Sequence, residues 1–104
     1  MQRRAFKMQL HPGQIAEYKR RHDLLWPELS DLLRSAGISD YSIFLDESTL
    51  TLFGVLKTTN PAALDALPTH EVMQRWWAYM ADIMDTHPTN EPVSIPLQEV
   101  FHLD

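Results

Sequence analysis

The first hydrophobic pattern in the chain is an alternation over residues 3–10. The residues on one side of it are Arg4, Phe6, Met8 and Leu10. A period of two is typical of a strand that buries one face. Apolar residues then recur at helical spacing over 15–36, and Gly37 follows as a left-handed cap. Pro27 predicts a kink or a restart of this helix, because its ring and missing N–H disrupt the preceding turn.

Two more strands and a second long helix follow. Residues 41–46 and 49–57 are strand candidates, joined by a hairpin at 46–48. Asn60-Pro61 opens a short helix that ends near Leu67, since proline is favoured at the first helical position. We expect Thr69 to cap the next helix, whose apolar positions are Val72, Met73, Trp76, Trp77, Met80, Ile83 and Met84.

The end of the chain is a proline-rich loop over 88–96 followed by an alternation over 97–103, which predicts a last strand. The order is therefore β-α-β-β-α-β. This order predicts an α+β fold of the ferredoxin-like type, with a four-stranded antiparallel sheet and both helices on one face. Another small α+β sandwich is the alternative. The chain has no internal repeat or linker, so we expect residues 1–104 to form a single domain.

The third predicted strand is apolar on both faces. Leu52 and Leu56 lie on one face, and Phe53 and Val55 lie on the other. Two helices can cover only one face of a sheet, so we expect an identical subunit to cover the second face in a homodimer. The simpler alternative is that Phe53 and Val55 are half-exposed strand residues.

Composition narrows the classes of function. The chain has a formal net charge of −5 and no cysteine. We expect no nucleic-acid or anionic-membrane partner, because both need a positive surface. Disulfides, thiolate zinc sites and cysteine nucleophiles are excluded, and the histidines lack metal-ligand spacing, so we expect no metal. With neither a long apolar segment nor the pattern of a signal peptide, a soluble cytoplasmic domain is expected.

One face of the first helix combines a hydroxyl with an imidazole. Tyr18 and His22 are four residues apart, so they share a face, and Ile15, Leu25 and Leu29 place that face inward. An imidazole with an ordinary pKa near 6.5 suits proton transfer at neutral pH. The spacing alone fits a histidine at the edge of the core, hydrogen-bonded to backbone, at least as well.

Aromatic residues form the second group of candidates. Trp76 and Trp77 are consecutive, so their side chains diverge by about 100° on a helix, and one can pack on the sheet while the other walls a cavity. Tyr41 opens the second strand on the side of Ile43 and Leu45. Aromatic faces stack on sugars, and indole N–H and phenol O–H groups bind hydroxyls. Ordinary core packing also explains each residue taken singly.

Together these segments resemble the L-rhamnose mutarotase family over the whole chain. The matching segments are RRAFKMQL at 3–10, EYKRRHDLLWPEL at 17–29, YSIFLD at 41–46, VMQRWWAYMADIM at 72–84 and PVSIPLQEVFHLD at 92–104. The resemblance implies a dimer of the dimeric α/β-barrel type that interconverts the anomers of L-rhamnose without cofactor or metal. It implies that His22 is the proton donor. The residues it implies as sugar contacts are Tyr18, Tyr41, Trp76 and Trp77.

Mutarotation opens the pyranose ring by protonation of the ring oxygen and removal of the anomeric hydroxyl proton. Rotation about C1–C2 and reclosure then give the other anomer. We expect His22 to protonate the ring oxygen, and the base stays open between a tyrosine, a carboxylate and bound water. The alternatives are a cofactor-independent monooxygenase or haem-degrading enzyme of the same fold, and a non-catalytic sugar-binding module.

Overall fold

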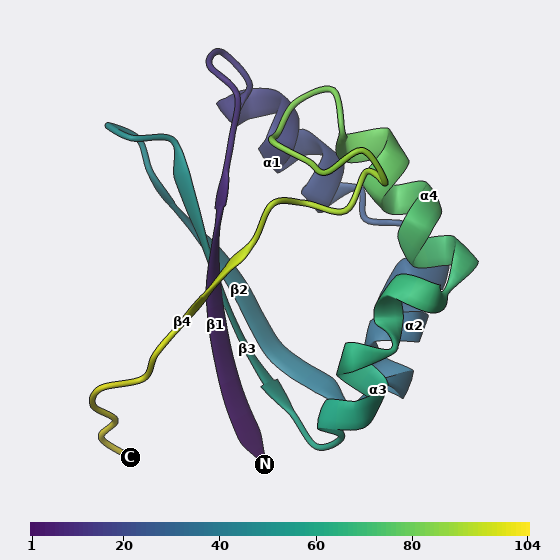
Figure 1. The fold of residues 1–104 in the computed structure, drawn as a ribbon, viewed down its shortest axis with the longest axis vertical. Helices are drawn as coiled ribbons and strands as arrows, with labels where there is room; N and C mark the ends of the chain where they lie inside the picture. The colour runs from purple at the N-terminus through teal and green to yellow at the C-terminus, as the bar shows by residue number, and fades with distance from the viewer.

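The computed structural model describes all 104 residues as five short helical segments and four strands. The elements are β1 (Gln2–Gln9), α1 (Ile15–Asp23), α2 (Pro27–Ser35), β2 (Ile38–Asp46), β3 (Thr51–Thr58), α3 (Pro61–Asp65), the 3₁₀ turn η1 (Leu67–Thr69), α4 (Glu71–Met80) and β4 (Ile95–Leu97). The helices lie on one side of the sheet, and its other side carries none (Figure 1).

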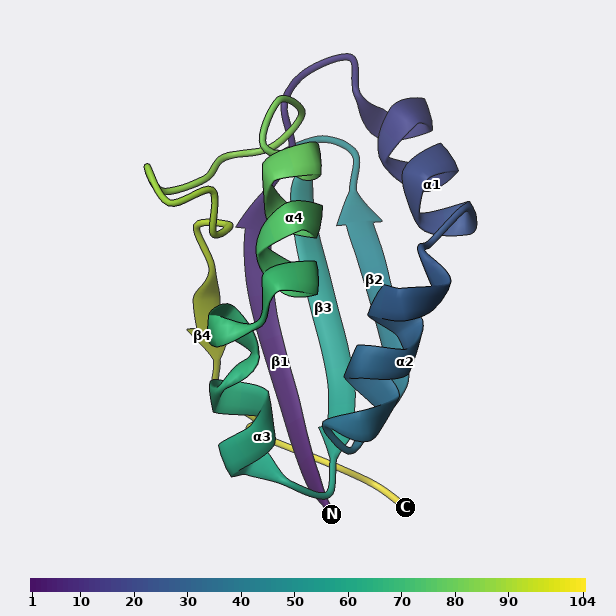
Figure 2. The ribbon, with the colours of Figure 1, turned by 90° about the vertical axis from the view of Figure 1, so that its right-hand side faces the viewer.

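The sheet has the strand order β2-β3-β1-β4, and every pair of neighbours is antiparallel. Because β3 lies between β1 and β2, the order is that of a split βαβ unit. The predicted α+β fold with a four-stranded antiparallel sheet and helices on one face is therefore confirmed. Figure 2 shows α4 over β1 and β3 and α2 over β2.

The segment 15–36 is two helices, and the predicted restart at Pro27 is confirmed, since Pro27 is the first residue of α2 after an extended Trp26. The helices differ from the prediction in two other places. The second long helix ends at Met80, because the following residues run back to β1, where Met84 bridges to Leu10. Thr69 does not cap α4, because it lies in η1 and its hydroxyl donates to a carbonyl of the preceding turn.

The last strand was predicted over 97–103, and this prediction is wrong. β4 is Ile95–Leu97 and pairs with only three residues of β1, and the chain beyond it is irregular. The alternation in the tail buries neither side, since Val100 and Phe101 are 89% and 77% exposed. Pro96 is tolerated in β4 because an edge strand needs fewer backbone donors than a central strand.

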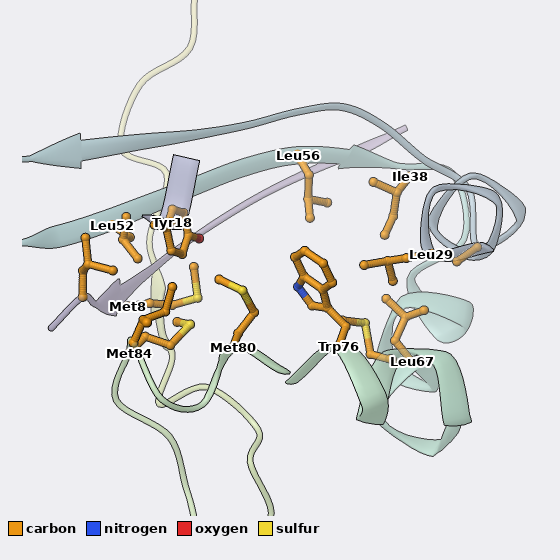
Figure 3. Packing of buried hydrophobic residues seen from close by; sticks show 14 residues of the cluster. Met8, Tyr18, Leu29, Ile38, Leu52, Leu56, Leu67, Trp76, Met80 and Met84 are labelled. Carbon is orange, nitrogen blue, oxygen red and sulfur yellow. The ribbon is translucent and has the colours of Figure 1, made fainter. Parts of the chain in front are cut away.

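The core lies between the inner face of the sheet and the helices (Figure 3). Leu52 and Leu56 of β3 are buried in it, as the alternation predicts. On the outer face of the sheet, Phe53 and Val55 are only half-buried and Phe44 is 61% exposed. No helix covers this face (Figure 1), but the C-terminal tail reaches one end of it, where the Arg3 guanidinium donates to the His102 ring. None of the helices is both long and apolar enough to cross a membrane.

Candidate active site

A cavity of about 1110 Å³ opens between the inner face of the sheet and the helices. All five residues singled out from the sequence line it: Tyr18, His22, Tyr41, Trp76 and Trp77. Small-molecule sites commonly enclose about 300–1,000 Å³, so this cavity has room for a monosaccharide. The fold therefore brings two helices and one strand, far apart in the sequence, around one space.

Helix α1 fixes the imidazole of His22 through two contacts with Tyr18. The two rings stack with centroids 4.2 Å apart, and Nδ1 of His22 lies 2.9 Å from the carbonyl oxygen of Tyr18. A carbonyl oxygen only accepts, so Nδ1 carries the proton and donates it. Nε2 makes no hydrogen bond within the chain and is the nitrogen that a ligand can meet. The backbone bond expected of a core-edge histidine is thus present, and it leaves one nitrogen available.

Burial sets the protonation of the titratable groups in the cavity. It lowers the pKa of His22 below its usual 6.5, against the opposing effects of the Tyr18 carbonyl and the charge of Asp23. Burial raises the pKa of Tyr18 well above its usual value, and partial burial of Tyr41, which is 38% exposed, raises the pKa of its phenol in the same direction. Both phenols therefore stay protonated at neutral pH, so they can donate a hydrogen bond but are poor bases.

The two tryptophans of α4 diverge as the helical geometry predicts. Trp76 is 6% exposed, and its indole points toward Leu56 of the sheet (Figure 3). Its ring meets the His22 imidazole edge-on, with centroids 5.4 Å apart. Trp77 is half-buried and lines the cavity beside it. Trp76 therefore supports the imidazole, while Trp77 offers an accessible aromatic face.

Tyr41 belongs to the sheet side of the cavity, where it is 38% exposed. The ring of Phe6 meets it edge-on at a centroid distance of 6.2 Å. Phe6 pairs with Gly54 on the neighbouring strand, and a Cβ at Gly54 would clash with the Phe6 ring. The absent side chain of Gly54 is what lets Phe6 lie across the sheet toward Tyr41.

Two aromatic residues near the site were not singled out from the sequence. Phe6 lines the cavity, and its place on the inner side of the first alternation could have indicated this. Trp26 lies between α1 and α2, where its ring meets Trp76 edge-on at 5.1 Å and stacks on Tyr79 at 5.6 Å. The only signal for Trp26 is its position before Pro27, which fixes an extended backbone but not a contact.

No group of three or more histidine, aspartate or glutamate side chains is placed to hold a metal ion. The carboxylates that line the cavity are Asp23, Asp40, Asp65 and Glu91. Three of them pair with cations: Asp23 with Lys19, Asp40 with Lys57 and Asp65 with Arg4. The site thus offers one imidazole, two phenols, aromatic faces and several carboxylates.

Residues 3–103 match the model of the L-rhamnose mutarotase family. The chain belongs to this family. A relative named L-rhamnose mutarotase from Jannaschia sp. is 65% identical over 103 residues, and one from Sinorhizobium fredii is 60% identical over 103 residues, with 99% of both chains covered in each case. The crystal structure of L-rhamnose mutarotase from Formosa agariphila superposes with a TM-score of 0.94 at 51% identity and covers all of both chains.

The resemblance to L-rhamnose mutarotases seen in the sequence is thus confirmed over almost the whole chain. It covers α1, which carries His22, and α4, which carries Trp76 and Trp77. The high structural similarity to one L-rhamnose mutarotase also extends to the open four-stranded sheet. The cavity described above is therefore part of a fold shared with a family of carbohydrate isomerases.

Proposed function

We propose that this chain is an L-rhamnose mutarotase, an isomerase that interconverts the α and β anomers of L-rhamnopyranose. The observation that carries the proposal is that one cavity, in a member of this family, is lined by Tyr18, His22, Tyr41, Trp76 and Trp77. These residue types supply a proton-transfer group, two hydroxyls and an aromatic wall. Binding and ring opening of a neutral pyranose require groups of these kinds.

His22 acts as the general acid. Its protonated form donates a proton from Nε2 to the ring oxygen as the bond between C1 and that oxygen breaks, since Nδ1 is held by the Tyr18 carbonyl. A base removes the proton of the anomeric hydroxyl, and the electron pair forms the aldehyde. Rotation about C1–C2 and the reverse steps close the ring as the other anomer. Only protons and one C–O bond move, so these steps need no cofactor or metal.

The other cavity residues bind and orient the sugar. The protonated hydroxyls of Tyr18 and Tyr41 bond to sugar hydroxyls, and Trp77 packs on the C–H face or the methyl group of the ring. The raised pKa values of the two phenols disfavour a tyrosine as the base. A carboxylate or a bound water is the better candidate.

The chain acts as a homodimer in this proposal. Its support is the apolar outer face of the sheet, with Phe44 61%, Ile95 51% and Leu97 38% exposed, a patch that a second copy could bury. The cytoplasmic location, expected because the sequence has neither a long apolar segment nor the pattern of a signal peptide, stays a proposal, which fractionation of the source cells would test.

Saturation-transfer NMR on L-rhamnose tests the proposed activity. Irradiation of the H1 signal of one anomer should deplete the signal of the other when the protein is added, and L-mannose, which carries a hydroxyl in place of the methyl hydrogen, measures the selectivity. A change in tryptophan fluorescence without faster exchange would indicate a sugar-binding module. Oxygen uptake with a quinol, or a visible spectrum with haem, would indicate the alternative enzyme classes.

A further inference from the structure

Arg21 is a buried cation directly beside His22 in the sequence. Its side chain is 9% exposed, whereas the neighbouring Arg20 is 55% exposed. Burial of a guanidinium is unfavourable unless charged and polar partners surround it. The burial of Arg21 therefore needs an explanation, whereas an exposed arginine would need none.

The partners of Arg21 lie on two different elements. Its Nε donates to Glu17 on α1 at 2.6 Å. Its terminal nitrogens donate to both carboxylate oxygens of Asp82, at 2.9 and 3.2 Å, and to the carbonyl oxygen of Tyr79 at 2.7 Å. The guanidinium also lies 4.4 Å from the centre of the Tyr79 ring. Arg21 thus ties α1 to the C-terminal end of α4 and the turn that follows it.

This tie joins the two helices that carry the candidate site. Helix α1 presents Tyr18 and His22, and α4 presents Trp76 and Trp77. Residues 24–26 break the helix after α1, so α1 and α2 are separate helices. Figure 2 shows α1 at the end of the helical layer, beyond β2.

The carboxylates around Arg21 carry the charge opposite to its own. The Arg21 guanidinium lowers the pKa of Asp82, and Arg20 and Arg21 together lower that of Glu17 to about 2. Both carboxylates are therefore ionised wherever the protein is folded near neutral pH. The polar contacts of Arg21 persist over the pH range in which His22 titrates.

We propose that Arg21 is a positioning residue for the reaction: by holding α1 on the end of α4, it keeps the His22 imidazole against Trp76 and aimed into the cavity. This inference rests on the role proposed for His22. Arg21 itself does not line the cavity, so it acts through the placement of His22 and does not touch the sugar. A shift of about 1 Å in a reacting group can lower a rate by about 10²-fold.

Arg21→Lys tests the proposal, because lysine keeps the charge but cannot bond to Glu17, Asp82 and the Tyr79 carbonyl together. We expect kcat for anomer exchange to fall by about ten- to a hundredfold with little change in KM. We also expect the pKa of His22, followed by its imidazole NMR signals, to rise toward 6.5 as water reaches the ring. Arg20→Lys is the matched control, since the hydrogen bonds of the exposed Arg20 go to Glu17 within α1 and its side chain only approaches Tyr79 of α4, and it should change both quantities far less than Arg21→Lys.

Asp82→Asn provides a milder version of the same test if Arg21→Lys does not fold. It weakens the bidentate contact, but Arg21 still bonds to Glu17 and the Tyr79 carbonyl, so kcat should fall less and the pKa of His22 should rise less.

The double variant tests whether Arg21 acts through His22. In a His22→Ala background, Arg21→Lys should cause no further loss of kcat. An equal loss in both backgrounds would overturn the proposal.

Wild-type kcat together with an unchanged pKa of His22 in Arg21→Lys would also overturn it. Failure of the proposed function gives a different result. His22→Ala would then exchange anomers at the same rate as the wild-type protein, while the pKa of His22 in Arg21→Lys would still report whether Arg21 holds the ring.

Discussion

The two ring nitrogens of His22 have separate tasks in this account. Nδ1 is bonded to the Tyr18 carbonyl at 2.9 Å, which fixes the ring and leaves Nε2 for chemistry. The neutral ring then offers a lone pair at Nε2, and the protonated ring offers an N–H. Burial lowers the pKa of His22 below 6.5, so the donor form is the minor one at pH 7 and its population rises as the pH falls.

The acid role predicts the pH dependence of turnover. The kcat for anomer exchange, corrected for the uncatalysed rate, should rise as pH falls through a pKa below 6.5 and then level off, because the imidazolium is the donor. Saturation-transfer NMR from about pH 8 to pH 5 measures this profile. A kcat that instead rises with pH to a plateau would make His22 the base. His22→Ala, measured over the same range, shows how much of the profile belongs to this residue.

At the scale of elements, the sequence predicts the order of strands and helices because local patterns determine it. It cannot predict the ends that depend on distant partners. The alternation over 97–103 requires a sheet edge to bury one side, and β1 pairs only with Ile95–Leu97. Helix α4 ends at Met80 because Met84 pairs with Leu10, 74 positions away in the chain. The same limit hides Trp26, whose contact with Trp76 joins separate elements.

Packing between β1 and β3 gives a prediction at this scale. In Gly54→Ala, the new Cβ would clash with the Phe6 ring, so the ring or the backbone beside it must shift, and the edge-on contact of Phe6 with Tyr41 changes with it. Overpacking of this kind lowers the free energy of unfolding by about 1–3 kcal/mol, although alanine itself favours regular structure more than glycine does. Urea denaturation measures the loss. Phe6→Leu in the Gly54→Ala background should restore part of it, and no loss in Gly54→Ala would contradict the tight contact.

In the whole molecule, helices cover one face of the sheet, and the other face carries only the C-terminal tail at one end. Helices cover the inner face, which bounds the cavity, and no helix lies on the outer face (Figure 1). The outer face exposes Phe44 opposite the half-buried Phe53. Water contact with such a patch is unfavourable at about 25 cal/mol per Å² of apolar surface, so burial against a second copy would stabilise the chain. The predicted homodimer remains a proposal at this scale.

The dimer proposal predicts that residues of the outer face determine whether the protein is a monomer or a dimer in solution. Light scattering during gel filtration should give twice the mass of the chain for the wild-type protein. Phe44→Lys should give the mass of one chain, because a charge would be buried in the interface, whereas Phe44→Leu should remain dimeric. A monomeric wild-type protein would contradict the proposal.

The most direct test of the account is the rate of anomer exchange of L-rhamnose in His22→Ala, measured by saturation-transfer NMR. His70→Ala is the control, because His70 is exposed and its side chain makes no hydrogen bond. The account predicts that His22→Ala stays folded and loses about 10²–10⁴-fold in kcat, the range that one positioned acid supplies, while His70→Ala keeps the wild-type rate. Wild-type exchange in folded His22→Ala would contradict the central claim.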